Sequence, residues 1–151
     1  MDRVSKYLRE EVTKRDKKII AAQIKRAPRD LIKIAKRCSY GQPQVIMTSP
    51  LLSDSQGIFF PTLFWLTCPY LDKEIARLEE QGWINKLQDK LARDKGFSIK
   101  MEKAHQRYRD LRQRLIKKQP QYLSKETIET GVGGIADLSK VKCLHAHYAH
   151  Y

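Results

Sequence analysis

The stretch FFPTLFWLTC, residues 59–68, is the most apolar run of the chain. It is rich in the aromatic and β-branched side chains that favour strands. Pro61 stands at its entrance, where a strand tolerates proline. We therefore predict a buried central strand over residues 62–67. From Pro69 onward the apolar residues take helical spacing, so the strand is expected to lead directly into a helix.

The sequence before this run predicts a basic helix followed by a β-hairpin. Apolar residues at helical spacing indicate an N-terminal helix over residues 3–26, which Pro28 would end. Residues 30–38, DLIKIAKRC, alternate as a strand does, and residues 45–48, VIMT, read as the returning strand. The intervening SYGQPQ has turn chemistry.

The sequence after this run is predominantly helical in pattern. We expect helices over residues 69–82, from residue 83 to near Gly96, and over residues 97–118, with a final helix starting at an Asp137 N-cap. The fold class is therefore α+β, with a small antiparallel sheet of about three strands covered by five or six helices. The length indicates one domain over residues 1–151.

The net charge of +13 is concentrated in two blocks. Residues 1–37 hold 13 Lys/Arg against 5 Asp/Glu, and residues 86–118 hold 12 against 4, so each block carries +8. Such a field attracts polyanions such as RNA, DNA or polyphosphate, and solvated helix faces are the alternative interpretation. The candidate contact residues are Lys14, Arg15, Lys17, Lys18, Lys100, Lys103, Arg107 and Arg114.

The apolar runs indicate the cellular compartment of the protein, and the compartment in turn indicates the state of its cysteines. No stretch approaches the ~18 apolar residues of a membrane span, and the first residues lack the apolar core of a secretory signal. We expect a cytoplasmic protein without a membrane partner. In a reducing compartment the three cysteines are free thiols, thiolate ligands or a nucleophile.

The stretch KVKCLHAHYAHY, residues 140–151, holds three of the four histidines. If it is helical, Cys143, His147 and His150 share one face and His145 lies on the opposite, core-facing side. Cys38 and Cys68, each at the edge of a predicted strand, are the remaining thiols. Three thiolates and one imidazole suit tetrahedral zinc, and a three-cysteine iron–sulfur site is the alternative. Against both, free cysteines are commonly small buried hydrophobes.

Two residues are candidates for catalysis. Cys68 stands at a strand-to-helix junction, where backbone N–H groups and the helix dipole favour a thiolate. A thiol-based enzyme using Cys68 is therefore a third hypothesis. His105 falls beside the apolar seam of the helix over residues 97–118. It is expected to be a core-edge histidine with a satisfied hydrogen bond, and a general base or proton shuttle is the alternative role.

Five motifs resemble one uncharacterised bacterial family, DUF501, named as a domain of unknown function. They are RCSYGQPQVI, FPTLFWLTCPYL, LEEQGWI, AHQRYR and GVGGI followed by VKCLHAHYAH. The resemblance covers roughly residues 28–151 and implies a small cytoplasmic bacterial protein without an assigned activity.

The resemblance also informs the site. It implies cysteines at the positions of Cys38, Cys68 and Cys143, and histidines at those of His145 and His150. This favours a shared role for the three thiols. It conflicts with the helical pairing of Cys143 with His147, because a partnership with His145 requires an irregular segment or a helix start at residues 143–145. The leading hypothesis is a metal-binding protein, with zinc preferred to iron–sulfur and His145 or His150 as the fourth ligand.

Overall fold

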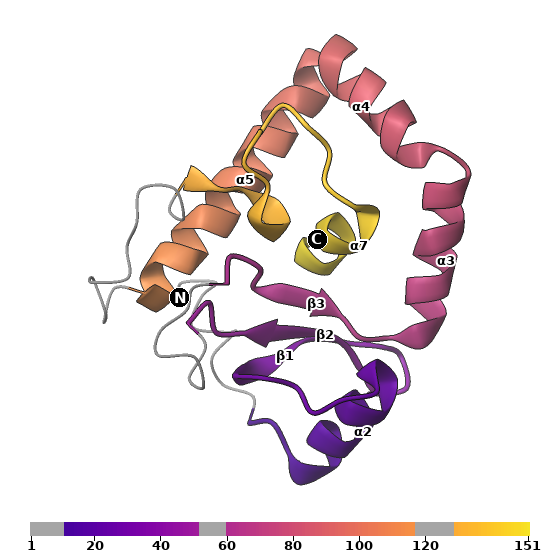
Figure 1. The fold of residues 1–151 in the computed structure, drawn as a ribbon, viewed down its shortest axis with the longest axis vertical. Coiled ribbons are helices and arrows are strands. Elements are labelled where there is room, and N and C mark those ends of the chain that lie inside the picture. Colours follow the sequence, from indigo (N-terminus) through magenta and orange to yellow (C-terminus); the bar gives the residue numbers. More distant parts are fainter. Residues whose placement is uncertain (1–10, 52–59, 117–128) are drawn as a thin grey trace.

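The computed structural model describes residues 11–51, 60–116 and 129–151. Within these residues five α-helices accompany one three-stranded antiparallel sheet, which confirms the predicted α+β class (Figure 1). The strands are β1 (Leu31–Arg37), β2 (Pro43–Thr48) and β3 (Phe64–Leu66). The helices are α2 (Lys14–Ile24), α3 (Pro69–Glu80), α4 (Trp83–Arg93), α5 (Lys95–Ile116) and α7 (Leu144–His150), and a short 3-10 helix, η2, spans Val132–Gly134.

The predicted hairpin is present. β1 and β2 pair antiparallel, with Leu31 opposite Thr48 and Ile34 opposite Ile46. In the turn the Cys38 N–H donates to the Gln42 carbonyl at 2.9 Å. Gly41 takes a φ of 74°, which L side chains rarely adopt. The turn chemistry read from SYGQPQ therefore closes the hairpin.

The strand predicted over residues 62–67 is shorter than expected and does not lie at the centre. β3 covers Phe64–Leu66 and pairs only with β2 in the order β1-β2-β3, so β2 is the central strand. The apolar side chains of this run pack against layers above and below the sheet. Phe64 packs against one core cluster and Trp65 against the other. The run is therefore apolar because its side chains pack on both faces of the sheet. It does not indicate that β3 has a strand neighbour on each side.

The sheet separates two apolar layers. On one face Ile34 and Ile46 pack with Ile20 of α2. On the other face Met47 and Leu63 form a buried cluster with Tyr108 of α5 and Val132 of η2. Figure 1 shows α2 on one side of the sheet and α5, η2 and α7 on the other. The alternation of side chains along β2 produces this division.

The N-terminal helix begins and ends inside its predicted range of residues 3–26. Thr13 is the N-cap of α2 and forms a capping box with Asp16, and Lys25 ends the helix in the left-handed conformation. Residues 1–10, on which the start of the prediction falls, lie outside the described residues.

α5 is fixed to the sheet by two fully buried polar side chains. The Tyr108 hydroxyl accepts the Leu63 N–H at 2.6 Å. Arg112 donates to the carbonyls of Pro61, Thr130 and Gly131 at 3.1, 2.7 and 2.9 Å. Gly131 is required here, because a Cβ would lie 2.3 Å from His105 Nδ1. These contacts hold β3 and η2 against one helix.

The final helix starts later than the sequence predicts. Asp137 is not its N-cap, because the carboxylate of Asp137 accepts the N–H and the hydroxyl of Ser139 at 3.0 and 2.6 Å within a turn. α7 begins at Leu144 and its N-cap is Cys143. It contacts β3, α3 and η2, and Figure 1 shows it surrounded by α3, α4 and α5. None of the described helices is long and apolar enough to cross a membrane.

Candidate metal centre

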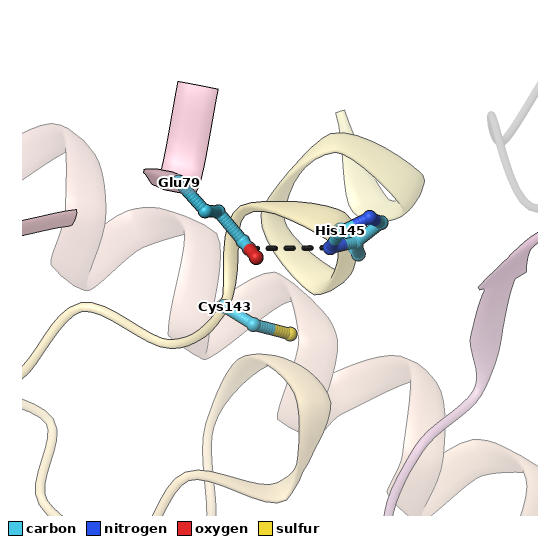
Figure 2. Close-up of side chains that lie close together, drawn as sticks. All are labelled: Glu79, Cys143 and His145. Atoms are coloured by element: carbon cyan, nitrogen blue, oxygen red, sulfur yellow. Dashed lines mark hydrogen bonds and ion pairs between the residues drawn. The ribbon is translucent and has the colours of Figure 1, made fainter. Parts of the chain in front are cut away.

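One cluster of metal-ligating side chains lies where α7 meets α3. The carboxylate of Glu79, the sulfur of Cys143 and a ring nitrogen of His145 all lie within 4.8 Å of one another. Figure 2 shows Glu79 and His145 facing each other, with Cys143 beside them. All three side chains are partly buried. Among the described residues this is the group of three or more such side chains whose geometry suits an ion.

The imidazole of His145 lies along α3 between two carboxylates. Its Nδ1 is 3.1 Å from Glu79 Oε1, and its Nε2 is 3.2 Å from Asp72 Oδ1. Nε2 also lies 3.1 Å from the Asp72 carbonyl oxygen. The ring is therefore oriented from both ends, because each nitrogen has an oxygen within hydrogen-bonding distance.

Local structure explains why these residues meet. Asp72 and Glu79 are seven residues apart on α3, which places them on the same helix face two turns apart. Cys143 has a non-helical backbone, with φ −54° and ψ 145°, as the N-cap of α7, so its side chain precedes the helix. The first helical N–H group, that of Leu144, donates to Glu79 Oε1 at 2.7 Å. Glu79 thus satisfies a helix-terminal donor and also contacts the His145 ring.

The donor set is one thiol, one imidazole and one carboxylate. Zinc accepts all three types, with bonds of about 2.0–2.3 Å and hence ligand atoms about 3.3–3.8 Å apart in a tetrahedron. In the cluster Glu79 Oε1 and His145 Nδ1 are 3.1 Å apart and all three ligand atoms lie within 4.8 Å of one another, so side-chain shifts of about 1 Å or less bring them to that geometry. Glu79 and Asp72 stand at different nitrogens of His145, so one can be a ligand while the other fixes the ring.

The other two cysteines lie outside this cluster. Cys38 is in the β1–β2 turn and Cys68 is the N-cap of α3, and neither belongs to the group around Cys143. Cys68 occupies the strand-to-helix junction that the sequence predicts, but its side chain makes no capping hydrogen bond there. Among the described residues, Cys143 is therefore the one cysteine that belongs to a group of three candidate ligands.

The remaining histidines are His105 of α5 and the partly buried His147 and His150 of α7. His105 is fully buried and its Nδ1 accepts the Val132 N–H at 3.0 Å, while no described residue bonds its Nε2. The ring of His150 contacts Tyr108 and Phe64, with centroids 5.0 and 5.8 Å apart. Burial lowers the pKa of both His147 and His150 to about 4. The prediction that His145 lies on the opposite side from Cys143 is wrong, because a ring nitrogen of His145 lies within 4.8 Å of the Cys143 sulfur.

The residues proposed for polyanion contact are exposed on two separate helices. Four belong to α2 and four to α5, and these helices pack on opposite faces of the sheet (Figure 1). The two basic helices therefore do not share one flat face. The α2 residues are Lys14, Arg15, Lys17 and Lys18, and the α5 residues are Lys100, Lys103, Arg107 and Arg114.

Sequence reasoning missed Asp72 and Glu79. The available signal was a pair of carboxylates seven residues apart on a predicted helix, with Glu79 inside the motif LEEQGWI. Such a pair is common on solvated helix faces, so it identifies a site only when a histidine is known to lie against it.

Comparisons with known proteins place the chain in one group. A family model described as "Protein of unknown function (DUF501)" matches residues 34–151. No curated protein and no solved structure matches the chain. The match begins inside β1 and includes β2, β3 and every member of the cluster around His145.

Proposed function

The chain belongs to the DUF501 family of proteins of unknown function, and we propose that it binds a divalent metal ion, zinc in preference, through Glu79, Cys143 and His145. The observation that carries the proposal is the approach of three different donor atoms to within 4.8 Å of one another, from two elements far apart in sequence. Asp72 supports it, because a second carboxylate at the far nitrogen of a liganding histidine fixes the tautomer and orientation of the ring.

The donor set favours zinc over an iron–sulfur cluster. One sulfur lies in the cluster, whereas iron–sulfur clusters are held mainly by several thiolates. Three protein ligands would leave one position of a tetrahedral zinc ion for water, which is the arrangement of catalytic and not structural sites. We assign the protein to the bacterial cytoplasm, whose reducing conditions would keep the Cys143 thiol available.

Metal binding is tested on untagged protein with ligand variants and matched cysteine controls. Purified chain incubated with zinc and then dialysed is expected to retain about one equivalent by elemental analysis. Cobalt substitution should give a thiolate-to-metal absorption band. Cys143→Ser, His145→Gln and Glu79→Gln are each expected to weaken binding at least about tenfold. Cys38→Ser and Cys68→Ser are the matched controls and should bind as the parent does.

The outcomes distinguish the ligand set Glu79, Cys143 and His145 from the set of three cysteines with one histidine. Retention of less than about a tenth of an equivalent by the parent chain would end the metal hypothesis. If Cys38→Ser and Cys68→Ser abolished binding while Glu79→Gln did not, the three-thiol set deduced from the sequence would replace the one proposed here. Glu80→Gln, the neighbouring carboxylate outside the cluster, controls for a general loss of negative charge.

A further inference from the structure

A hollow lies on the opposite face of the sheet from the candidate metal centre. It has a volume of about 180 Å³ and opens where the end of α2 and the segment leading to β1 meet β2 and β3. Its apolar floor includes Ile24, Ile46 and Trp65, which belong to the α2-side core cluster. Drug-sized ligands occupy about 300–1,000 Å³, so this hollow suits a smaller molecule.

The rim of the hollow is cationic. Arg26 and Arg29 both line it and are both exposed. Neither guanidinium has a hydrogen bond or an ion pair with any of the residues that the structure describes. None of the described residues lining the hollow is acidic. Two arginines without a described ion-pair partner, over an apolar floor, favour an anionic ligand, because guanidinium groups bind phosphate and carboxylate oxygens in bidentate fashion.

The walls carry hydroxyl groups with unused hydrogen-bonding capacity. Thr67 is 3% exposed, and its Oγ1 has no partner among the described residues. The Thr48 Oγ1 accepts the Trp65 Nε1–H at 3.0 Å, and the Ser49 Oγ accepts the Leu51 N–H at 3.1 Å. Each of these hydroxyls still has its own hydrogen to donate. A buried hydroxyl without a partner is costly, so the one on Thr67 calls for an acceptor.

Part of the apolar lining is aromatic. Phe60 and Trp65 stack with ring centroids 5.6 Å apart and planes inclined by 23°, and both rings line the hollow. Phe60 is exposed although it is large and apolar. A flat apolar surface beside two cations suits a ligand that combines one ring with one negatively charged group.

We infer that this hollow, named here the α2–β3 pocket, binds a small organic anion built from one flat ring and one phosphate group. Arg26 and Arg29 contact the phosphate, the hydroxyls donate to it, and the ring lies against Trp65 and Phe60. The site is separate from the metal cluster and does not depend on the proposed metal binding.

Binding is tested by calorimetry and by fluorescence of the full chain in the presence of a chelator, which separates this site from the metal cluster. Trp65 and Trp83 are the two tryptophans, so Trp83→Phe leaves Trp65 as the sole reporter. The probes are phenyl phosphate, AMP and UMP, with inorganic phosphate and phenol as half-ligands. At least one of the three probes is expected to bind with a dissociation constant below about 1 mM and to change Trp65 emission. Each half-ligand should bind at least about tenfold more weakly.

Matched arginine variants give the decisive comparison. Arg26→Ala and Arg29→Ala should each weaken binding at least about tenfold, whereas Arg93→Ala, an exposed arginine of α4, should leave it unchanged. All three substitutions are at exposed positions and should preserve the melting temperature. Thr67→Val should weaken binding at least about threefold without lowering the melting temperature, because it removes a hydroxyl that bonds to none of the residues that the structure describes.

Three results would overturn the inference. One is no binding of any probe at concentrations up to about 10 mM. Another is binding that is unchanged in the Arg26→Ala, Arg29→Ala double variant. A third is an affinity for inorganic phosphate equal to that for phenyl phosphate, since it would remove the role of the aromatic wall.

Discussion

Asp16 links the start of α2 to the end of β1. Its carboxylate accepts the Thr13 N–H at 3.0 Å within the capping box. It also accepts two hydrogen bonds from the Arg37 guanidinium, at 2.8 and 3.1 Å. The hydrogen bond from Arg37 is the main reason that the pKa of Asp16 lies well below its ordinary value. A single charged residue therefore fixes one helix against the hairpin.

Asp16→Asn is expected to destabilise the protein in a pH-dependent manner. At pH 7 it should lower the free energy of unfolding by about 1–2 kcal/mol, because one charge-assisted pair and part of the cap are weakened. The depressed pKa means that Asp16 stabilises the fold above about pH 4, and this contribution is lost as the pH falls through its folded pKa. The difference in the free energy of unfolding between parent and variant, measured by urea denaturation, should therefore become smaller as the pH falls. Asp89→Asn, at an exposed position on α4, is the control. A gap that stays constant from pH 7 to about pH 3 would contradict this account.

Among the elements, α7 shows where sequence reasoning succeeds and where it fails. The hairpin and the starts of α3 and α4 could be predicted, because turn residues, Pro69 and apolar spacing act locally. The start of α7 could not, because Asp137 is an equally good residue for the Ser139 turn that it actually forms. Moving the helix start to Leu144 turns His145 toward α3. The family resemblance implies a cysteine at Cys143 and histidines at His145 and His150, and in the structure a ring nitrogen of His145 lies within 4.8 Å of the Cys143 sulfur.

The packing of α7 predicts acid sensitivity through His150. Its folded pKa is lowered to about 4 by burial, whereas in the unfolded chain it is about 6.5. Between these values the unfolded state takes up a proton and the folded state does not, so stability is lost as the pH falls from about 6.5 to about 4. The loss from this residue is expected to reach up to about 3 kcal/mol.

His150→Phe isolates this contribution, since it keeps an aromatic ring against Tyr108 and removes the titration. The variant should show a shallower decline in the free energy of unfolding over the same pH range. Denaturant titrations at several pH values provide the measurement. Parallel pH profiles for parent and variant would show that His150 is not the group responsible.

In the molecule as a whole, the sheet determines which basic helices and candidate sites lie on the same side. The sequence locates two basic blocks but cannot place them relative to each other, and the structure puts α2 and α5 on opposite faces. The same sheet separates the candidate metal centre from the α2–β3 pocket. Glu79 and Asp72 could not be assigned from sequence because their partner, His145, approaches from more than sixty residues away.

Zinc is expected to stabilise the entire fold, because its proposed ligands join α3 to α7. At a free zinc concentration of one hundred times the dissociation constant, the free energy of unfolding should rise by about 2.7 kcal/mol. For a chain of this size that corresponds to a melting temperature higher by roughly 5–10 °C. Differential scanning calorimetry of the parent and of Cys143→Ser provides the measurement. An equal shift in both proteins would mean that zinc acts elsewhere.

The docking of α7 on β3 sets the order in which the molecule assembles. These segments are separated by roughly eighty residues, so bringing them together costs far more chain entropy than closing the short β1–β2 turn. The hairpin can consequently form early, while the side chains of Met47, Leu63 and Val132 stay exposed to solvent until α7 packs against them. A partly folded chain of this kind exposes apolar surface. We therefore expect aggregation to compete mainly with the docking of α7.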